Sequence, residues 1–284
     1  MPDVIALHLR HLELLGRAPE TIACRRRALT RMQQLLGVPL LEASGEDLAV
    51  WRATLNVGPG TVAGYVSHAR SFYEWARLTC RYDGNPAAGL PVPKQGRTLP
   101  RPITEADLLA AVTGAPPRIR PWLVLAAYAG LRAKEIALLR RECVRETARP
   151  PALLIALSAT KGHRERVVPL SRFCLGELLD HGLPRSGYVF RRADGLPGPN
   201  TPSRVSQVAN NWLRGAGIDA TLHQLRHRFG TQVYAVDHDL RLTQELLGHA
   251  RPSTTAGYAA WDQASAAATV EALPAPGCLR AVTG

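Results

Sequence analysis

Apolar residues recur with helical spacing through the first 90 residues, and turn or capping residues separate the repeats. Ser44 is placed to cap one of these segments, and the Gly-Pro-Gly at 58–60 precedes another. The pattern predicts four helices, centred on residues 5–12, 19–37, 44–55 and 61–73. Four helices in succession indicate a small helical bundle.

A segment rich in proline and glycine follows the bundle. It carries five prolines and three glycines between Gly84 and Pro102, a composition that interrupts both helices and strands. We therefore expect a linker at 91–101. The domains on either side are expected at 1–90 and 102–273, with a C-terminal tail at 274–284.

The second domain begins with further helical patterns. Thr104 is a predicted N-cap, and an apolar helix is expected at 119–128. The break at Gly130 precedes a short helix that carries Arg132 and Glu135. Because these two residues lie three positions apart on one helical face, the carboxylate can orient the guanidinium group.

Two short apolar runs interrupt the helical pattern. The runs at 152–157 and 164–170 predict the strands of a hairpin, with its turn at 160–163. Helical patterns return after the hairpin, and one of them, 240–247, is closed by Gly248. The second domain is therefore expected to be mainly helical with a small β-sheet.

The charge balance predicts a polyanionic partner. Lys and Arg number 35 against 23 Asp and Glu, which gives a net charge of +12 and a pI near 10.2. Both parts of the chain share it, with 12 basic and 8 acidic residues before residue 100 and 23 and 15 after it. A codon bias towards arginine could also produce this excess of basic residues. We nevertheless expect nucleic acid as the leading partner.

The few lysines and cysteines narrow the chemistry. The pKa of a lysine can be lowered until the side chain donates a proton, whereas arginine keeps its proton. The chain has three lysines, Lys94, Lys134 and Lys161. The cysteines form no CxxC pair, so neither a zinc site nor a disulfide framework is indicated. No secretory or membrane-spanning segment is predicted, and we expect a cytoplasmic protein.

Six residues carry groups suited to metal-free attack on a phosphodiester: Arg132, Lys161, His223, Arg226, His249 and Tyr258. Guanidinium groups match the oxygens of a phosphate bidentately and keep their charge. A tyrosine hydroxyl beside them can act as a nucleophile and leave a covalent phosphotyrosine.

Two other chemistries are weighed against this interpretation. His223 and His227 have the i, i+4 spacing of metal ligands, but the glutamate of an HExxH motif is missing and no third ligand is marked. The GxxxxGK[ST] phosphate loop is absent, so ATP use is not implied. We expect no metal and no cofactor.

Four segments of the chain resemble the signature segments of the tyrosine recombinases, also called phage-type integrases. They are AGLRAKEIALL around Arg132, TKGHRERVVPL around Lys161, HQLRHRFGT from His223, and ELLGHARPSTTAGYAAW from Glu245. The resemblance extends over nearly the whole chain. It implies a mainly α fold with a small β-sheet, in which an N-terminal helical core-binding domain and a mixed α/β catalytic domain form a C-shaped clamp on DNA.

The resemblance also implies a role for each residue of the proposed site. Arg132 and Arg226 would clamp the scissile phosphate while Tyr258 attacks phosphorus, which gives a 3′-phosphotyrosyl link and a free 5′-hydroxyl. Lys161 would protonate the departing oxygen. His223 is the candidate for proton transfer with the tyrosine, because a free phenol with a pKa near ~10 is a poor nucleophile at neutral pH.

Two further residues have supporting roles in this interpretation. His249 would donate a hydrogen bond to a nonbridging oxygen, and Glu135 would support Arg132. Because the phosphotyrosine keeps the energy of the phosphodiester, a 5′-hydroxyl from another duplex can reseal the break without ATP. Recombination is therefore expected rather than degradation, in integration and excision or in resolution.

The resemblance also predicts the partners. Four strands require four active sites, which implies a homotetramer on double-stranded DNA assembled from monomers or weak dimers. The segment from about Trp261 to Leu273 would dock onto a neighbouring protomer. Accessory DNA-bending or directionality proteins are a further class of partner. The chain is expected to begin at the core-binding bundle, which favours a Xer-like or mobile-element recombinase.

Contacts to DNA outside the site are expected from basic residues of the first domain and the linker. The run of arginines at 25–27 has an alternative interpretation as a solvated helix face. The candidates are Arg25, Arg26, Arg27, Arg70 and Lys94.

Three other functions remain open from sequence alone. A type IB-like topoisomerase would use a similar site to relax supercoils. A non-catalytic DNA-binding regulator would keep the fold without the chemistry. A metal-dependent nuclease would be inhibited by EDTA, whereas the recombinase hypothesis predicts that cleavage survives chelation.

Overall fold

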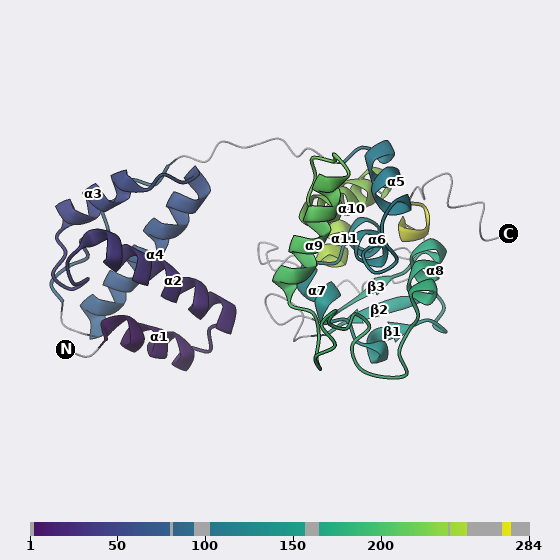
Figure 1. Ribbon diagram of the computed structural model, residues 1–284, viewed down its shortest axis with the longest axis horizontal. Helices are drawn as coiled ribbons and strands as arrows, with labels where there is room; N and C mark the ends of the chain where they lie inside the picture. Colours follow the sequence, from purple (N-terminus) through teal and green to yellow (C-terminus); the bar gives the residue numbers. More distant parts are fainter. Residues whose placement is uncertain are drawn as a thin grey trace. The chain divides into compact units, whose positions relative to one another are not determined.

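The computed structural model describes residues 3–79, 82–93, 103–156, 165–237, 239–248 and 269–273 (Figure 1). The chain divides into two compact units, Met1–Thr98 and Leu99–Gly284. Most of the expected linker at 91–101 lies outside the described residues. Among those that are described, no helix is long and apolar enough to cross a bilayer.

The first unit contains the four helices that the periodicity predicts, and local signals set their ends. Asp3 caps the first helix and Ser44 forms a capping box with Asp47 at the third, while Gly37 ends the second with φ of 72°. The bounds are α1 Val4–Leu14, α2 Pro19–Leu36, α3 Gly45–Thr54 and α4 Pro59–Thr79.

One face of each of these helices is buried in a common core, which includes Leu29, Leu48 and Phe72. Tyr73 is also buried, and its hydroxyl donates a hydrogen bond of 2.8 Å to the carbonyl of Leu40. The tyrosine hydroxyl thus keeps a partner inside the core, as a buried phenol requires.

The core of the first unit also contains a histidine. His8 is 1% exposed and its ring lies against Phe72 and Trp75, with centroid distances of 5.4 and 4.9 Å. Neither ring nitrogen has a hydrogen-bond partner among the described residues. Burial, with the charges of Arg25 and His11, lowers the pKa of His8 to about 4. His8 is therefore neutral in the folded protein at neutral pH.

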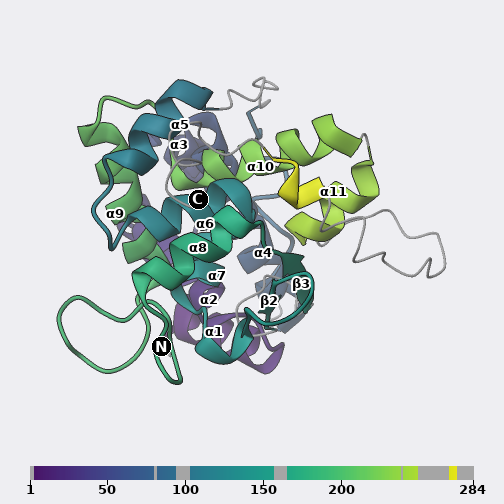
Figure 2. The same cartoon turned by 90° about the vertical axis from the view of Figure 1, so that its right-hand side faces the viewer.

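The second unit is mainly helical with one small sheet. Its elements are α5 Glu105–Thr113, α6 Arg120–Tyr128, α7 Ala133–Ala137, η1 Arg141–Cys143, β1 Val144–Arg145, β2 Ala152–Ile155, β3 Arg166–Pro169, α8 Arg172–His181, α9 Pro202–Gly215, α10 Leu222–Asp237 and α11 Leu240–Leu247. Residues 121–128 of α6 are all buried, and α6 packs against α5, α8 and α10. Figures 1 and 2 show α6 surrounded by these helices.

The predicted hairpin is confirmed as an antiparallel pairing of β2 with β3, in which Leu153 faces Val168. The predicted turn at 160–163 lies outside the described residues. A third strand, β1, pairs with β2 on its other side and was not predicted. Two residues are too few for an alternating pattern to appear in the sequence.

The connection between α6 and α7 requires a glycine and changes the predicted position of Arg132. Gly130 has φ of 62°, and a Cβ there would overlap the Phe229 ring of α10. The helix predicted to carry Arg132 begins one residue later, so that Arg132 is its N-cap with extended backbone (φ −78°, ψ 156°). Glu135 lies within this helix, as predicted.

The buried His8 predicts an acid-sensitive first unit. Its pKa is about 4 when folded and about 6.5 when unfolded, so the unfolded chain binds more protons between these values. The stability is fully present above pH 6.5 and is lost as the pH falls towards 4. We expect His8→Phe to be less acid-sensitive than wild type by about 2 kcal/mol between pH 7 and 4, measured by urea unfolding.

His11→Phe is the control, because His11 lies on the same helix but is only partly buried. It should keep most of the acid sensitivity of the wild type, because the charge of His11 is a smaller cause of the lowered pKa of His8 than burial is. Equal acid sensitivity in the His8→Phe and wild-type chains would contradict the assignment of the effect to His8.

Candidate active site

The centre of the site is a buried carboxylate that binds three arginines. The Glu135 side chain is 0% exposed and accepts hydrogen bonds from the Arg132 backbone N–H at 2.8 Å and Nη1 at 2.9 Å. Arg166 of β3 donates to both carboxylate oxygens at 2.8 Å, in a bidentate pair. Arg226 of α10 places Nη1 3.7 Å from Oε2. Segments distant in sequence therefore meet at one charge.

The electrostatics of Glu135 follow from this arrangement. Burial alone would raise the pKa of its carboxyl group, but the hydrogen bonds and charges of Arg166, Arg132 and Arg226 outweigh burial and lower it. The carboxylate is therefore ionised at neutral pH. Three cations and one anion leave an excess of positive charge at this position.

The same arginines satisfy the C-terminal end of α11. The last carbonyl groups of a helix have no intrahelical partner. Arg166 Nε donates to the Leu246 carbonyl at 3.0 Å, and Arg132 Nη2 donates to the Gly248 carbonyl at 3.0 Å. Arg226 donates to the carbonyl between them, that of Leu247. Three successive carbonyl groups are thus held by three different arginines.

Gly248 ends α11 in the left-handed conformation, with φ of 61°, as predicted. A Cβ at this position would lie 2.9 Å from Nη1 and Cδ of Arg166, so the arginine also requires a glycine here. His249 follows directly and lies outside the described residues, as do Lys161 and Tyr258. Their predicted roles remain predictions.

The arginines differ in accessibility. The Arg132 side chain is 23% exposed, against 8% for Arg166 and 3% for Arg226. Arg226 also donates to the Gly130 carbonyl. Burial and the neighbouring Arg132 lower the pKa of Arg226 to about 9, against the opposing effect of Glu135, which leaves the guanidinium charged at neutral pH. Arg132 is thus the most accessible of the three cations.

His223 is exposed and lies three residues before Arg226 on α10. Its ring is perpendicular to that of His227, with a centroid distance of 4.5 Å. Partial desolvation, followed by the charges of His227, Arg226 and Arg132, lowers the pKa of His223. A neutral imidazole at neutral pH can accept a proton.

The two histidines were also weighed as metal ligands. Within the residues that the structure describes, no group of three or more His, Cys, Asp or Glu side chains is arranged to hold a metal ion. The ring contact between His223 and His227 instead links them as neighbours along one face of α10.

Arg166 was not among the predicted site residues. In the sequence it is one of several basic residues in the segment HRER, and its pairing with Glu135 spans 31 positions. Arg166 directly precedes an apolar run in the sequence, and nothing in that pattern indicates that its side chain is buried. Its bidentate contact is visible only once β3 lies beside α7.

The predicted DNA-contact residues differ in their surroundings. Arg25 is partly buried and donates to the His68 carbonyl at 3.1 Å, and Arg70 donates to the carbonyls of Ala87 and Leu90 at 3.2 and 2.7 Å. Both guanidinium groups thus hold the first unit together. Arg26 and Arg27 are exposed on α2, and Lys94 lies outside the described residues.

Comparison with known proteins places this site in a family. A sequence model of the phage integrase family matches residues 104–264. Tyrosine recombinase XerC of Chromobacterium violaceum is 29% identical over 279 residues, covering 92% of this chain and 91% of that protein. Tyrosine recombinase XerA of Thermococcus kodakarensis is 30% identical over 270 residues, covering 90% of each.

Solved structures give the same result. The integrase of mycobacterium phage Brujita has a TM-score of 0.52 at 25% identity, covering 94% of this chain and 91% of that one. A λ integrase dimer bound to a COC′ core site has a TM-score of 0.68 at 16% identity, covering 87% and 94%, which shows the shared fold.

The chain belongs to the phage integrase family. The predicted family is therefore confirmed, as is the fold class, mainly helical with a small sheet. The comparisons also confirm the predicted activity, that of a site-specific DNA recombinase of the tyrosine type.

The shared carboxylate predicts a large loss of stability when its charge is removed. Glu135→Gln keeps the shape of the side chain but leaves the buried arginines without their anion. We expect the free energy of unfolding, measured in urea, to fall by about 3–5 kcal/mol.

Glu142→Gln is the matched control, because Glu142 pairs with Arg140 at the surface, where both side chains are about half exposed. Its effect should stay below about 1 kcal/mol. Similar losses in the two variants would show that burial of the Glu135 charge is not the source of the effect.

Proposed function

We propose that this recombinase cuts and rejoins double-stranded DNA through a 3′-phosphotyrosine on Tyr258, with Arg132, Arg226 and His223 acting on the scissile phosphate. The observation that carries the proposal is that Arg132 and Arg226 both donate to carbonyl groups at the end of α11, while His223 lies near enough for the charges of both to lower its pKa. The residue that follows this end, His249, begins the segment that holds Tyr258.

The arginines supply fixed charge for the transferring phosphoryl group. Their forks are preorganised by Glu135 and by the carbonyl groups of α11, so little reorganisation accompanies the reaction. Arg132 approaches one nonbridging oxygen from the more exposed side. Arg226 contributes from within the protein, where its positive charge is less screened by water.

His223 is suited to accept the proton of the Tyr258 hydroxyl as that oxygen attacks phosphorus. Its lowered pKa keeps the imidazole neutral at neutral pH, ready to take up the proton. Lys161 then donates a proton to the departing 5′-oxygen, and His249 donates a hydrogen bond to a nonbridging oxygen. The P–O5′ bond breaks as the bond from phosphorus to the phenolic oxygen forms, so one phosphodiester bond is exchanged for another.

Resealing reverses these steps with a 5′-hydroxyl as nucleophile, so no ATP is needed. We propose that four protomers act together on two DNA sites in the cytoplasm, in integration and excision or in resolution. Support comes from λ integrase, whose solved structures include a tetramer bound to a Holliday junction. The relatives are recombinases, so neither a topoisomerase nor a non-catalytic regulator is favoured.

The covalent intermediate gives a direct test. A nicked suicide substrate, whose short 5′-hydroxyl fragment diffuses away after cleavage, should trap a protein–DNA adduct that migrates slowly on a denaturing gel. We expect the adduct with wild type in EDTA and none with Tyr258→Phe. Peptide mapping of the adduct to another residue, or its loss on chelation, would contradict the proposal.

A second test addresses Arg132. Arg132→Lys keeps the charge but loses the bidentate fork, and we expect the cleavage rate on the same substrate to fall about a hundredfold. Arg132→Ala should lose more. Replacing the scissile phosphate by an uncharged methylphosphonate should then reduce the defect of Arg132→Ala, because the charge that the arginine balances is gone.

Arg214→Ala is the control, since Arg214 is exposed on α9 and lies outside the cluster. It should cleave at the wild-type rate. An Arg132→Ala defect of equal size on both substrates would assign the arginine a structural rather than an electrostatic role.

A further inference from the structure

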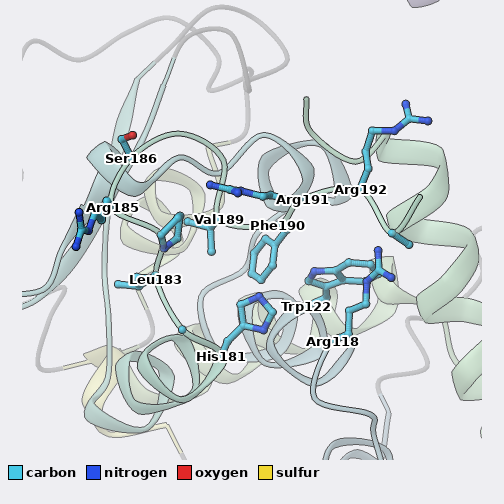
Figure 3. Close-up of a pocket in the computed structure, with 13 residues that line it drawn as sticks. Arg118, Trp122, His181, Leu183, Arg185, Ser186, Val189, Phe190, Arg191 and Arg192 are labelled. Atoms are coloured by element: carbon cyan, nitrogen blue, oxygen red, sulfur yellow. The ribbon is translucent and has the colours of Figure 1, made fainter. Parts of the chain in front are cut away.

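The second unit contains a basic cavity outside the arginine cluster of the active site. It has a volume of about 860 Å³ and lies between the beginning of α6 and the loop that follows α8 (Figure 3). Arginines are the commonest charged residues in its wall, and none of the described residues that line it is acidic. The residues that matter for its chemistry are Arg118, Arg185, Arg191, Arg192, His181 and Trp122.

Most of these arginines are available to a ligand. Arg118, Arg185 and Arg191 are exposed, and among the described residues no carboxylate pairs with them. Arg192 is bound to Asp194 by a hydrogen bond of 2.9 Å from Nε. Figure 3 shows the four guanidinium groups on different sides of the cavity. A ligand in the cavity would therefore meet these guanidinium groups on several of its sides.

The floor of the cavity is aromatic. The Phe190 ring lies against His181 and Trp122, with centroid distances of 5.1 and 6.1 Å. Trp122 is 2% exposed, and its indole N–H has no acceptor among the described residues. A buried donor without a partner is uncommon in a folded protein. Trp122 therefore adds an aromatic ring with an unpaired donor to the residues that line the cavity.

The positive potential comes from side chains rather than from helix ends. The N-terminus of α6 and the C-terminus of α8 both meet at this cavity, so their dipoles oppose one another. The guanidinium groups are not offset in this way. A small, multiply charged anion is the ligand class that such a set of forks recognises.

The cavity is separate from the site of strand cleavage. Among the described residues that line it, none belongs to the arginine cluster, and six residues of α6, about 9 Å at 1.5 Å per residue, follow Trp122 before the helix ends short of Arg132. Its volume falls within the range of about 300–1,000 Å³ that is typical of small-ligand pockets. One nucleotide unit with its phosphates fits this range.

We propose that this cavity binds the phosphate groups of a nucleotide-sized ligand, at a position distinct from the scissile phosphate. The arginines bind the phosphates at the rim, and the partly buried His181 ring offers a face for the base. The ligand is either a free nucleotide or a nucleotide of a DNA strand, which share this chemistry. The proposal is independent of the catalytic roles of Arg132, Arg226 and Tyr258.

Binding to the full chain tests the proposal in two arms. The first titrates ATP and inorganic pyrophosphate by calorimetry in EDTA. The second measures affinity for a short duplex over a range of salt concentrations. The variants are Arg185→Ala and Arg191→Ala, and Arg214→Ala on α9 removes the same charge away from the cavity. Thermal unfolding verifies that each variant remains folded.

A free-nucleotide site predicts that wild type binds ATP and pyrophosphate, and that each cavity variant weakens this binding about tenfold or more while the control does not. A backbone site predicts no ATP binding and a salt slope for duplex binding that is lower by about one in each cavity variant. Cavity variants that match Arg214→Ala in both arms would overturn the proposal.

Discussion

The candidate active site depends on one buried anion surrounded by three guanidinium groups. Without Glu135, the mutual repulsion of Arg132, Arg166 and Arg226 in a region largely removed from water would oppose folding. With Glu135 present, α7, β3, α10 and the end of α11 are held together around its carboxylate. α7 is only five residues long and has little stability of its own, so its position depends on this ionic contact together with the burial of Ile136 and Ala137 in the core.

The arrangement also explains how the site keeps a positive charge while its members are buried. Each arginine has more N–H groups than the carboxylate can accept, and the surplus donors reach the carbonyl groups at the end of α11. The surplus donors are therefore satisfied by neutral carbonyl groups, which leave the net positive charge of the cluster in place. Arg132 is the most exposed of the three.

Local features of the fold could be predicted from the sequence, and long-range features could not. Ser44 and Gly248 mark helix ends because their effect is confined to neighbouring backbone groups. Arg132 and Glu135 were linked correctly because they are three residues apart. Arg166 was missed because its partner is distant in sequence, and the inward-facing contacts of Arg70 were missed for the same reason.

The hydrogen bonds from the three arginines to the end of α11 have a practical consequence for experiments on this enzyme. Arg132 and Arg226, the arginines proposed to bind the phosphate, also donate hydrogen bonds that hold α11 in position. Replacing either of them would therefore change the structure of the protein as well as its reactivity. A loss of turnover in such a mutant is therefore ambiguous by itself. An inert but correctly assembled protein for trapping complexes is better obtained by changing the nucleophile and leaving the guanidinium groups and Glu135 intact.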